Sequence, residues 1–462
     1  MINIPDKTKK HLEFIYNEFA ENNHKCYLVG GCIRDSLLGK EPKDWDLATS
    51  ATTKEMYEIF CDKVELIPTG VEFGTLTFLI DGVSYEVTTF RGDVYDEERG
   101  DNAHHPSWVE FVDDINIDLS RRDFTINAMA YDIKTEELID PFFGQKHLKE
   151  KVIKCVGNPI ERIKEDPLRM LRAIRFQAQL DFSLHVKLSC EIHKQKELIH
   201  TISAERIREE LNKILLSNNV DILWYHCDSI LKEIIPELSD LKRIKQNSPW
   251  HIYDAFEHSI VTTGIVEPEL HLRLAMLLHD LGKADTLTTD ENGIDHFYGH
   301  GKVSCDKARE ILKRLKYSNE MIDKVCLLIK EHDRRIELSK KAVKRVLNLI
   351  GEEATRDLLK IRWADICAQN PVHLKPRAKK VFDLTALVEE VIENKEPFSR
   401  KDLAINGDDL IKIGFKPGKD IGLVLNEILE LVIRQPETND KEALILYAKG
   451  LLSTIDTLRL TK

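Results

Sequence analysis

The stretch that decides the fold is Tyr27-Leu-Val-Gly-Gly-Cys-Ile-Arg-Asp35, followed by Pro42-Lys-Asp-Trp-Asp-Leu-Ala48. Its pattern predicts a strand, a glycine turn, a helix and a second strand. Gly30 and Gly31 let the backbone approach a polyphosphate closely, and the helix that follows would direct free N–H groups at that anion. A double-glycine turn alone is weak evidence for a phosphate site, so the residues around it decide the interpretation.

Two carboxylates follow this turn at a spacing that suits a strand. Asp44 and Asp46 are separated by one residue, so on an extended strand both project from one face while Trp45 points into the opposite layer. Such a pair can hold two Mg²⁺ ions, which would activate an attacking 3′-hydroxyl and neutralise the departing pyrophosphate. Glu86, in Tyr85-Glu-Val-Thr-Thr-Phe-Arg91, is the candidate third carboxylate on a neighbouring strand. A bare D-x-D is more often a solvated turn, but its surroundings favour the metal site.

The composition bounds the class of protein. A chain of 462 residues is too long for one ordinary core, so roughly three packed units are expected. Its apolar runs are far shorter than the roughly 20 residues that cross a bilayer, and its start lacks the features of a secretory signal. We therefore expect a cytoplasmic protein without a membrane segment. The nine cysteines contain no C-x-x-C pair, which predicts reduced thiols. A net charge of -12 still permits RNA binding if basic residues cluster in one groove.

The periodicity of apolar residues changes along the chain. The first third mixes an amphipathic helix at residues 8–22 with β-rich runs at residues 74–80 and 85–91, which predicts an α/β domain on a small sheet. Later, β-type alternation nearly vanishes, and helical patterns follow one another, for example at residues 166–179 and 203–217. The remainder is predicted to be almost entirely helical. Pro and Asn interrupt this periodicity near residues 158, 246–249, 370 and 396, which predicts breaks there.

The motif G-G-x-x-R-D, here Gly30, Gly31, Arg34 and Asp35, followed by D-x-D, resembles the opening motif of a known family. This is the bacterial-type tRNA nucleotidyltransferase and poly(A) polymerase family of the polymerase-β superfamily. The resemblance covers nearly the whole chain. It implies an α+β polymerase-β-like nucleotidyltransferase head with a small mixed sheet, followed by an elongated all-α neck, an HD-type body and a tail. The implied domains are a head at residues 1–150, a base-selecting and RNA-binding neck at 151–245, an HD domain at 246–370 and a tRNA-binding tail at 371–462.

A second family motif appears as Arg121-Arg-Asp-Phe-Thr-Ile-Asn-Ala-Met129. Its spacing predicts that Asp123 and Asn127 share one helical face. In the family this segment holds the incoming sugar and phosphates. Asp123 can accept a hydrogen bond from a ribose 2′-OH, while Arg121 and Arg122 can neutralise a triphosphate.

A third motif, Glu165-Asp-Pro-Leu-Arg-Met-Leu-Arg-Ala-Ile-Arg175, resembles the family's base-selecting helix. Asp166 and Arg169 are predicted to lie one turn apart and to present an acceptor beside a donor. Such a pair accepts cytosine and adenine but leaves polar groups unpaired against uracil or guanine, which is costly in a desolvated pocket. In isolation the pair would be an ordinary helix ion pair. Arg172 and Arg175 complete the predicted nucleotide-binding set, and Ile202-Ser-Ala-Glu-Arg-Ile-Arg-Glu-Glu-Leu211 resembles a helix that braces it.

Two connecting segments bear on how the pocket changes. The family carries a mobile loop with a basic core that helps switch from C to A, and this chain has Asp101-Asn-Ala-His-His-Pro106, with Ala103 at the expected basic position. Because the loop length is preserved, addition of A is expected to be retained. Asp140-Pro-Phe-Phe-Gly144 matches a hinge-like segment of the family, where flexing is expected.

A second metal site is predicted in the helical half. His258, His279, Asp280 and Asp365 follow the order of an HD phosphohydrolase site, in which imidazoles and carboxylates converge on one metal. His300 and His332-Asp333 could complete a shell for a second metal, although each alone is more often a surface histidine. The resemblance implies a divalent ion here (Mg, Mn, Ni or Fe) and accessory phosphatase and 2′,3′-cyclic phosphodiesterase activities. A retained but inactive fold is the alternative.

Together the motifs predict template-independent addition of CCA to the tRNA 3′ end, with CTP and ATP as nucleotide donors and Mg²⁺ as cofactor. The alternatives are a poly(A) polymerase, an enzyme that adds only C-C or only A, and an HD phosphohydrolase with a passive RNA-binding head. From Ser399 onward the chain resembles the family's tRNA-holding region. The basic run at residues 375–380 would favour phosphates or form a solvated helix face.

Overall fold

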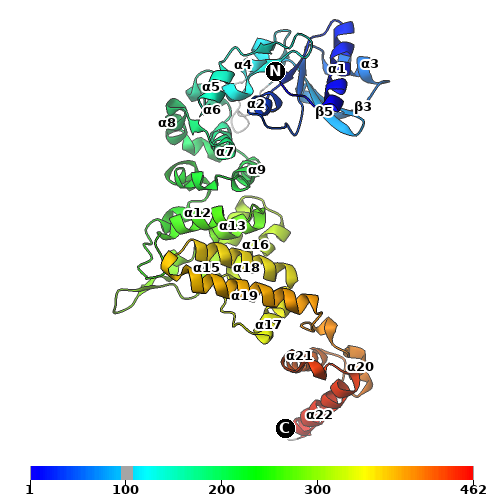
Figure 1. Ribbon diagram of the computed structural model, residues 1–462, viewed down its shortest axis with the longest axis vertical. Coiled ribbons are helices and arrows are strands. Elements are labelled where there is room, and N and C mark those ends of the chain that lie inside the picture. Colours follow the sequence, from blue (N-terminus) through cyan, green and yellow to red (C-terminus); the bar gives the residue numbers. More distant parts are fainter. Residues whose placement is uncertain (1, 95–107, 461–462) are drawn as a thin grey trace. The chain divides into compact units, whose positions relative to one another are not determined.

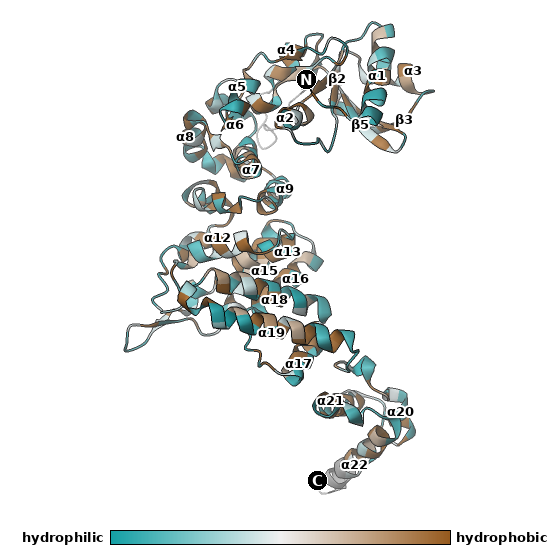
Figure 2. Ribbon diagram, viewed as in Figure 1, coloured by the Kyte–Doolittle hydropathy of each residue, from teal (hydrophilic) through white to brown (hydrophobic). Residues whose placement is uncertain are grey.

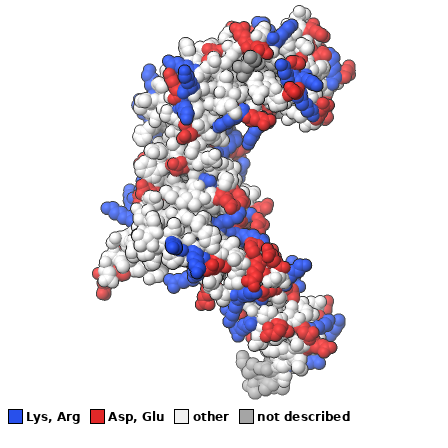
Figure 3. Space-filling view, in the orientation of Figure 1, with Lys and Arg blue, Asp and Glu red and all other residues white. Residues whose placement is uncertain are grey.

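The computed structural model describes residues 2–94 and 108–460 of the chain (Figure 1). The chain divides into two compact units, Met1–Pro236 and Glu237–Lys462. On the face drawn in Figure 3, acidic and basic side chains are interspersed rather than separated into one basic surface. Within the described ranges, no helix combines the length and the apolar character needed to span a bilayer.

A seven-stranded mixed sheet organises the start of the first unit. The strands lie in the order β3-β4-β5-β2-β1-β8-β9, and all neighbours are antiparallel except β2 and β5, which are parallel. This confirms the predicted α+β head with a small mixed sheet. The strands are β1 (Cys26–Val29), β2 (Leu47–Thr49), β3 (Glu65–Gly70), β4 (Thr75–Ile80), β5 (Val83–Thr89), β8 (Ala130–Tyr131) and β9 (Leu138–Ile139).

Helices α1 (Asp6–Glu21) and α3 (Thr53–Phe60) contribute apolar faces to the core of this head. Phe19 and Phe60 have ring centroids 4.9 Å apart, and Phe60 also lies 4.6 Å from Phe78 of β4. All three rings are fully buried, and such contacts stabilise a core beyond their area alone. The head therefore has a core of its own beneath the sheet.

The predicted strand at residues 85–91 is in fact two strands. β5 ends at Thr89, and β6 (Arg91–Val94) pairs with β7 (Trp108–Phe111) in a separate two-stranded sheet. The break falls at Phe90, whose side chain is buried and whose N–H donates to the carbonyl of Thr49. The chain changes partners there, which a continuous β-rich pattern does not reveal.

Helices make up nearly all of the rest of the first unit, as predicted, joined by the small pair β10 (Val152–Ile153) and β11 (Ser183–Leu184). The helix expected from residue 166 begins instead at Arg169. Asp166 precedes Pro167, and a residue before proline is disfavoured in the α region. The φ and ψ of Asp166 are accordingly -144° and 97°. The helices are α2 (Gly31–Leu37), α4 (Ile115–Ser120), α5 (Gly144–Lys149), α6 (Pro159–Glu165), α7 (Arg169–Leu180), α8 (Val186–Lys194), α9 (Ala204–Leu215) and α10 (Lys232–Ile234).

The second unit is helical apart from the short hairpin β12 (Thr288–Thr289) and β13 (Asp295–His296). Residues 271–278 of α13 are all buried, and this helix is largely apolar in Figure 2; a helix that is apolar all round belongs in a core. The helices are α11 (Glu237–Leu241), α12 (Ala255–Ile265), α13 (Leu270–Leu278), α14 (Lys283–Thr286), α15 (His300–Arg314), α16 (Asn319–Glu331), α17 (Lys340–Ile350), α18 (Glu352–Cys367), α19 (Leu374–Glu393), α20 (Gly407–Lys412), α21 (Lys419–Arg434) and α22 (Lys441–Leu460).

The three boundaries between the four predicted domains stay predictions, but two features of the structure bear on them. The division between the units falls at residue 236, earlier than the expected boundary at 245. Helix α19, which starts just after the expected boundary at 370, packs against α18 and α17. A separate core, with Leu410, Ile428 and Leu444 fully buried, forms among α20, α21 and α22.

Candidate functional sites in the head and in the helical unit

The predicted carboxylates of the head lie at two neighbouring strands, but only Glu86 is within one, whereas the expected strand position of Asp44 and Asp46 is not found because β2 begins at Leu47. Asp44 and Asp46 immediately precede β2, and Leu47 of β2 is paired with Val87 of β5. Asp46 directly precedes Leu47, and Glu86 directly precedes Val87, so the two acidic residues occupy matching positions beside this pair of residues. Trp45, between the two aspartates, is only 6% exposed, as expected from its alternation to the opposite layer.

The electrostatics of these carboxylates suit a divalent cation. Burial raises the pKa of Asp46 to about 6, and the negative charges of Glu86 and Asp44 add to that effect, while Arg122 opposes it. A cation between these oxygens would relieve both the desolvation and the repulsion. In the described part of the chain, however, the three carboxylates do not form a group with all ligand oxygens within 4.8 Å of one another. Side-chain movement would therefore accompany metal binding.

The glycine turn brings an arginine close to these carboxylates. Gly30 has a φ of +79°, and a Cβ at this position would lie 2.9 Å from Nη1 of Arg122. Only glycine combines this backbone conformation with so close an approach. Arg34 Nη1 donates to Asn127 Oδ1 at 2.8 Å, and Arg34 also forms an ion pair with Asp35. Asp35 therefore has an ion-pair partner within its own helix, α2. Gly31 is the first residue of that helix.

Asp123 and Asn127 meet, but not on an α-helix as predicted. Residues Thr125–Asn127 form a 3-10 turn, and Asn127 Nδ2 donates to Asp123 Oδ1 at 3.0 Å. Arg172 Nε donates to the other oxygen, Oδ2, at 2.9 Å. Burial alone would raise the pKa of Asp123, but the Arg172 charge and these hydrogen bonds hold it down to about 2. Asp123 is therefore an ionised acceptor already shared with Arg172.

The pair Arg121 and Arg122 depends on a residue that the sequence interpretation missed. Asp118, on α4, is fully buried and forms ion pairs with Arg121 at 2.8 Å and Arg122 at 3.1 Å. Burial raises the pKa of this carboxyl, but the two guanidinium groups more than offset it and lower the pKa overall. The i,i+3 and i,i+4 spacing of Asp118 from the arginines is the signal that would have found it.

The predicted base-selecting pair is not formed side by side. Arg169 is 5% exposed and donates to Glu165 at 2.7 Å and to the Arg162 carbonyl at 2.9 Å. Asp166 forms an ion pair with Arg206 of α9 at 3.2 Å. Arg206 belongs to the helix expected only to brace this segment, so sequence reasoning missed its contact with Asp166.

The other predicted head residues are placed as follows. Arg175 pairs with Glu210 of α9 at 3.2 Å and lies over the Phe176 ring, so it joins α7 to α9. Asp140 accepts from the Gly144 N–H at 2.6 Å and so fixes the start of α5; flexing there stays a prediction. Ala103 and its loop lie outside the described residues.

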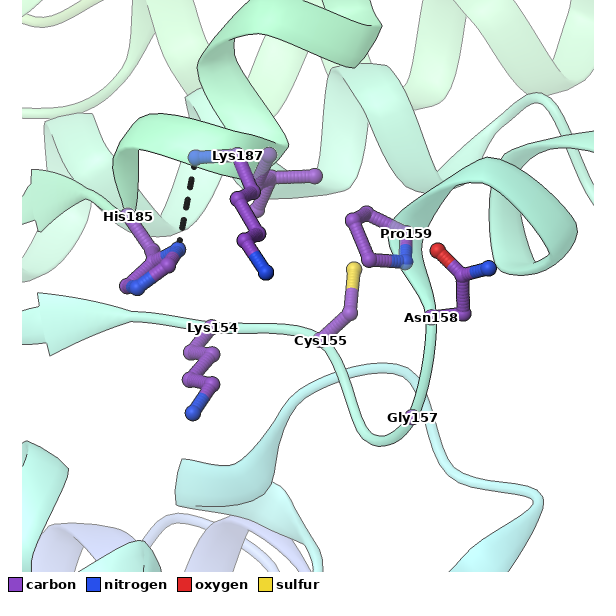
Figure 4. A pocket seen from close by; sticks show the side chains of 8 residues that line it. Lys154, Cys155, Gly157, Asn158, Pro159, His185 and Lys187 are labelled. Carbon is purple, nitrogen blue, oxygen red and sulfur yellow. Dashed lines mark hydrogen bonds between the residues drawn. The ribbon is translucent and has the colours of Figure 1, made fainter.

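A pocket of about 600 Å³ also lies in the first unit, beside the loop that leads into α6. Figure 4 shows Lys187 directed into it, while Lys154 extends away from Lys187, so the two ammonium groups do not converge. Burial raises the pKa of the Cys155 thiol to about 12, so this thiol stays protonated. The pocket lacks the geometry of a single anion site and is not part of the predicted site.

The predicted ligands of the second metal site come together in the helical unit. His258 of α12 has its Nε2 2.9 Å from Asp365 Oδ1 of α18 and 3.9 Å from Asp280 Oδ2. His279 ends α13, and its Nε2 lies 3.2 Å from Asp280 Oδ2. His258, His279 and Asp365 offer ligand atoms that all lie within 4.8 Å of one another. We call these four residues the HD cluster.

Two histidines from other helices complete this cluster. His300 is the first residue of α15, and its Nε2 lies 3.6 Å from Asp280 Oδ1 and 3.0 Å from the Nε2 of His332, which directly follows α16. His279, Asp280 and His332 form a second group within 4.8 Å. Asp333, in contrast, is exposed.

The hydrogen bonds of the four histidines fit a metal. In each ring Nδ1 lies within hydrogen-bond distance of a backbone carbonyl, and because a carbonyl only accepts, Nδ1 carries the hydrogen. Nε2 is then left with a lone pair directed into the cluster. His279 Nε2 and Asp280 Oδ1 are buried without a hydrogen-bond partner, which is costly unless a ligand satisfies them. The Nδ1 atoms of His258, His279, His300 and His332 lie near the carbonyls of Ala368, Met276, Phe297 and Ile329, respectively.

Comparison with known proteins places this geometry in a family. The CCA-adding enzyme of Lactobacillus helveticus (strain DPC 4571) is 32% identical over 430 residues, covering 92% of this chain and 93% of its own. That of Ligilactobacillus salivarius (strain UCC118) is 33% identical over 463 residues, covering 97% and 98%. The chain belongs to the CCA-adding enzyme family. The family predicted from the motifs, a tRNA nucleotidyltransferase family, is thereby confirmed.

Solved CCA-adding enzymes share this fold. The Bacillus stearothermophilus CCA-adding enzyme in complex with CTP aligns with a TM-score of 0.72 at 24% identity, covering 98% of this chain and 100% of that one. The Thermotoga maritima CCA-adding enzyme complexed with tRNA_CCA aligns with a TM-score of 0.59 at 21% identity, covering 97% and 96%.

Three family models match different parts of this member of the CCA-adding enzyme family. They describe the poly A polymerase head domain (residues 26–154), a probable RNA and SrmB-binding site of polymerase A (181–241) and a putative tRNA nucleotidyltransferase domain 2 (286–448). The first spans every predicted head residue from Gly30 to Asn127. His258, His279 and Asp280 lie outside all three models, so the predicted HD relationship stays a prediction.

Proposed function

We propose that this protein adds C, C and A to the 3′ end of tRNA from CTP and ATP without a nucleic-acid template. The observation that carries the proposal is the match to CCA-adding enzymes along almost the full chain, combined with carboxylates just before β2 and within β5, near Arg122. The binding of CTP by the Bacillus stearothermophilus relative and of tRNA by the Thermotoga maritima relative supports it.

In this proposal Asp44, Asp46 and Glu86 hold Mg²⁺. The bound ions would supply activation of the RNA 3′-hydroxyl and neutralisation of the charge that develops on the departing pyrophosphate. Arg121 and Arg122, held by Asp118, face the triphosphate and leave it less free to move. The nucleotide ribose donates a hydrogen bond to Asp123, which stays ionised at neutral pH. The chain thus positions the α-phosphate for attack.

The base is chosen by side chains in this proposal. Asp166 accepts from the exocyclic amine of cytosine or adenine, and a guanidinium donates to the neighbouring ring acceptor. Arg169 can donate only if nucleotide binding draws it away from Glu165, whereas Arg206 already reaches Asp166. A carbonyl in the place of the amine would leave Asp166 without a donor, which disfavours uracil and guanine.

End-sequencing of products tests the proposal. We expect the purified protein to add two C residues with CTP alone, and CCA with both nucleotides, to a tRNA lacking its CCA. Asp46→Asn should abolish addition, whereas Asp62→Asn, an exposed aspartate of the same unit, should leave it intact. Runs of A made from ATP alone would instead establish a poly(A) polymerase.

A second function, metal-dependent hydrolysis of a phosphate ester, is favoured by the HD cluster. Its lone pairs, its two carboxylates and its unsatisfied buried atoms fit a divalent ion such as Mn²⁺, Ni²⁺, Fe²⁺ or Mg²⁺. Such an ion would supply a water of lowered pKa beside the phosphate. Asp280 and Asp365 are held ionised by the surrounding histidines and Lys283 despite their burial, which lowers the pKa of both. They can therefore accept a hydrogen bond from the attacking water. In the proposed reaction the water oxygen bonds to phosphorus, the ester P–O bond breaks, and the alcohol leaves with a proton.

Metal analysis tests this second function. We expect the intact chain to retain Mn²⁺ or Ni²⁺ after gel filtration and His279→Ala to lose it, while Asp46→Asn, in the other unit, retains it. Equal metal content in the unaltered protein and in His279→Ala would contradict the proposed hydrolase function.

A further inference from the structure

A small basic pocket lies beside the HD cluster. It has a volume of about 190 Å³, and Asp365 of the cluster and the neighbouring His332 line one part of it. Arg335, Arg362, Arg377 and Lys380 line the rest, from the chain after α16 and from α18 and α19. We call these four side chains the basic pocket residues.

The basic pocket residues outnumber the carboxylates that line the same pocket. Among the side chains that the structure describes, none of the four forms an ion pair with a carboxylate. The lining contains two carboxylates, the exposed Asp333 and Asp365, and Asp365 already accepts from Gln369. Four cations against two carboxylates leave an excess of positive charge, which favours an anionic ligand.

Two of these arginines are also tied to groups that support the HD cluster. Arg362 Nε donates to the backbone carbonyl of His332 at 3.2 Å. Arg377 donates to Gln369 Oε1, and Gln369 Nε2 donates to both carboxylate oxygens of Asp365 at 3.1 and 3.0 Å. Guanidinium groups bind the oxygens of phosphate in a planar, forked arrangement. The fixed positions of Arg362 and Arg377 therefore place such a ligand next to the cluster.

From this arrangement we infer that the pocket binds the terminal phosphate group of a phosphomonoester. Ligand pockets for whole small molecules measure roughly 300 to 1,000 Å³, so a pocket of about 190 Å³ admits a terminal group and not an entire nucleotide. A terminal phosphate carries about two negative charges at neutral pH, whereas a diester carries one. Four cations select the dianion.

The inference extends the proposed hydrolase function. Only the hydrolysis of the bound ester rests on that function, because phosphate binding by the arginines needs no metal. It names the class of substrate for the HD cluster. The scissile phosphorus would lie between the guanidinium groups and the cluster, and the alcohol part of the substrate would remain outside the pocket. Apolar side chains such as Ile336 and Leu384 complete the wall, which excludes water from part of the site.

Phosphate titration of the full-length chain tests the inference. Arg377 lies 5.8 Å from the centroid of the Trp250 ring, so tryptophan fluorescence should respond to occupancy. In EDTA, at pH 8 and constant ionic strength, we expect inorganic phosphate and phenyl phosphate to bind alike and dimethyl phosphate to bind about tenfold more weakly, as one lost charge-assisted hydrogen bond implies. Equal binding of the diester, or of succinate as a dicarboxylate, would overturn the inference.

A matched pair of double variants on α19 supplies the control. Arg377→Met with Lys380→Met removes two pocket charges, whereas Lys375→Met with Lys379→Met removes two exposed charges from the same helix. Calorimetry should show phosphate affinity at least about tenfold weaker in the first variant and unchanged in the second. Equal affinity in both would overturn the inference, and circular dichroism would verify that each remains folded.

Turnover separates the two proposals. Loaded with Mn²⁺, the chain should hydrolyse p-nitrophenyl phosphate, and the pocket variant should show a raised KM with unchanged metal content. If phosphate binds as expected but the metal-loaded chain hydrolyses no phosphomonoester, the hydrolase proposal fails while the pocket stands. If the pocket variant hydrolyses the ester with an unchanged KM, the pocket inference fails while the hydrolase stands.

Discussion

At the scale of single residues, function and stability oppose each other at Asp46. Burial, Glu86 and Asp44 raise its pKa from 3.8 to about 6, so ionisation at neutral pH costs the folded state up to ~3 kcal/mol. We predict that Asp46→Asn, while inactive, increases the free energy of unfolding by about 1 to 2 kcal/mol at pH 7.5 in EDTA. Urea denaturation followed by tryptophan fluorescence measures this.

The pH dependence of this gain supplies the control. Because the folded-state pKa is raised, the folded protein binds more protons than the unfolded chain between about pH 4 and pH 6. The protein with Asp46 therefore becomes more stable, relative to the Asn variant, as the pH falls through this window. The advantage of the variant should be full above pH 6 and should disappear near pH 4. A loss of stability at pH 7.5, or a gain independent of pH, would contradict the prediction.

At the scale of elements, the sequence predicted the arrangement of side chains best where one regular period governs them. The two-residue spacing of Asp44 and Asp46 agrees with the burial of Trp45 between them, because alternation along an extended chain depends on no other element. Helical spacing misplaced Asp166, since Pro167 excludes it from α7. It also gave Asp123 and Asn127 a helix where the chain makes a 3-10 turn.

Contacts between different helices could be predicted less well from the sequence. The partner of Asp166 is Arg206, which comes from another helix. The basic pocket needs residues from the end of α16, from α18 and from α19, and no local pattern states how these helices pack. Part of it could nevertheless be anticipated, because the run at residues 375–380 suggested either a phosphate site or a solvated face. The structure places Arg377 and Lys380 in the lining of the pocket and leaves Lys375 exposed, and the phosphate site stays a prediction.

Helix α4 offers a prediction at this scale. Its Asp118 is fully buried and holds both Arg121 and Arg122, so Asp118→Asn removes the negative charge that the two guanidinium groups share. We expect a loss of about 3 to 5 kcal/mol in unfolding free energy, as for other broken buried ion pairs, and CTP affinity weakened about tenfold because the arginines lose their position. Thermal unfolding and calorimetric titration with CTP measure the two effects.

The matched control lies on the same helix. Asp114 is exposed and caps α4 by accepting from the Asn116 N–H at 2.9 Å. Asparagine caps a helix about as well as aspartate, so Asp114→Asn should change neither stability nor CTP affinity. Similar effects of the two substitutions would show that Asp118 contributes only helix charge and does not position the arginines.

At the scale of the whole molecule, the two proposed chemistries occupy different units. Every proposed residue of nucleotide addition lies in Met1–Pro236, and the HD cluster and its basic pocket lie in Glu237–Lys462. The model for the putative tRNA nucleotidyltransferase domain 2 lies in the second unit, at residues 286–448. Nucleotide binding should therefore depend on the first unit alone, whereas addition to tRNA should need both.

Separate expression of the two units tests this division. Each unit has a buried core of its own, such as Phe90 and Leu119 in the first and Ile428 and Leu444 in the second, so each should unfold cooperatively. We expect residues 1–236 to bind CTP with the affinity of the full chain but to add nothing to tRNA, and residues 237–462 to retain the divalent metal. Calorimetry, metal analysis and end-sequencing give the three readouts. Loss of the metal from a folded second fragment would mean that the cluster is completed by the first unit, and full transfer by the first fragment alone would show that tRNA is held without the second.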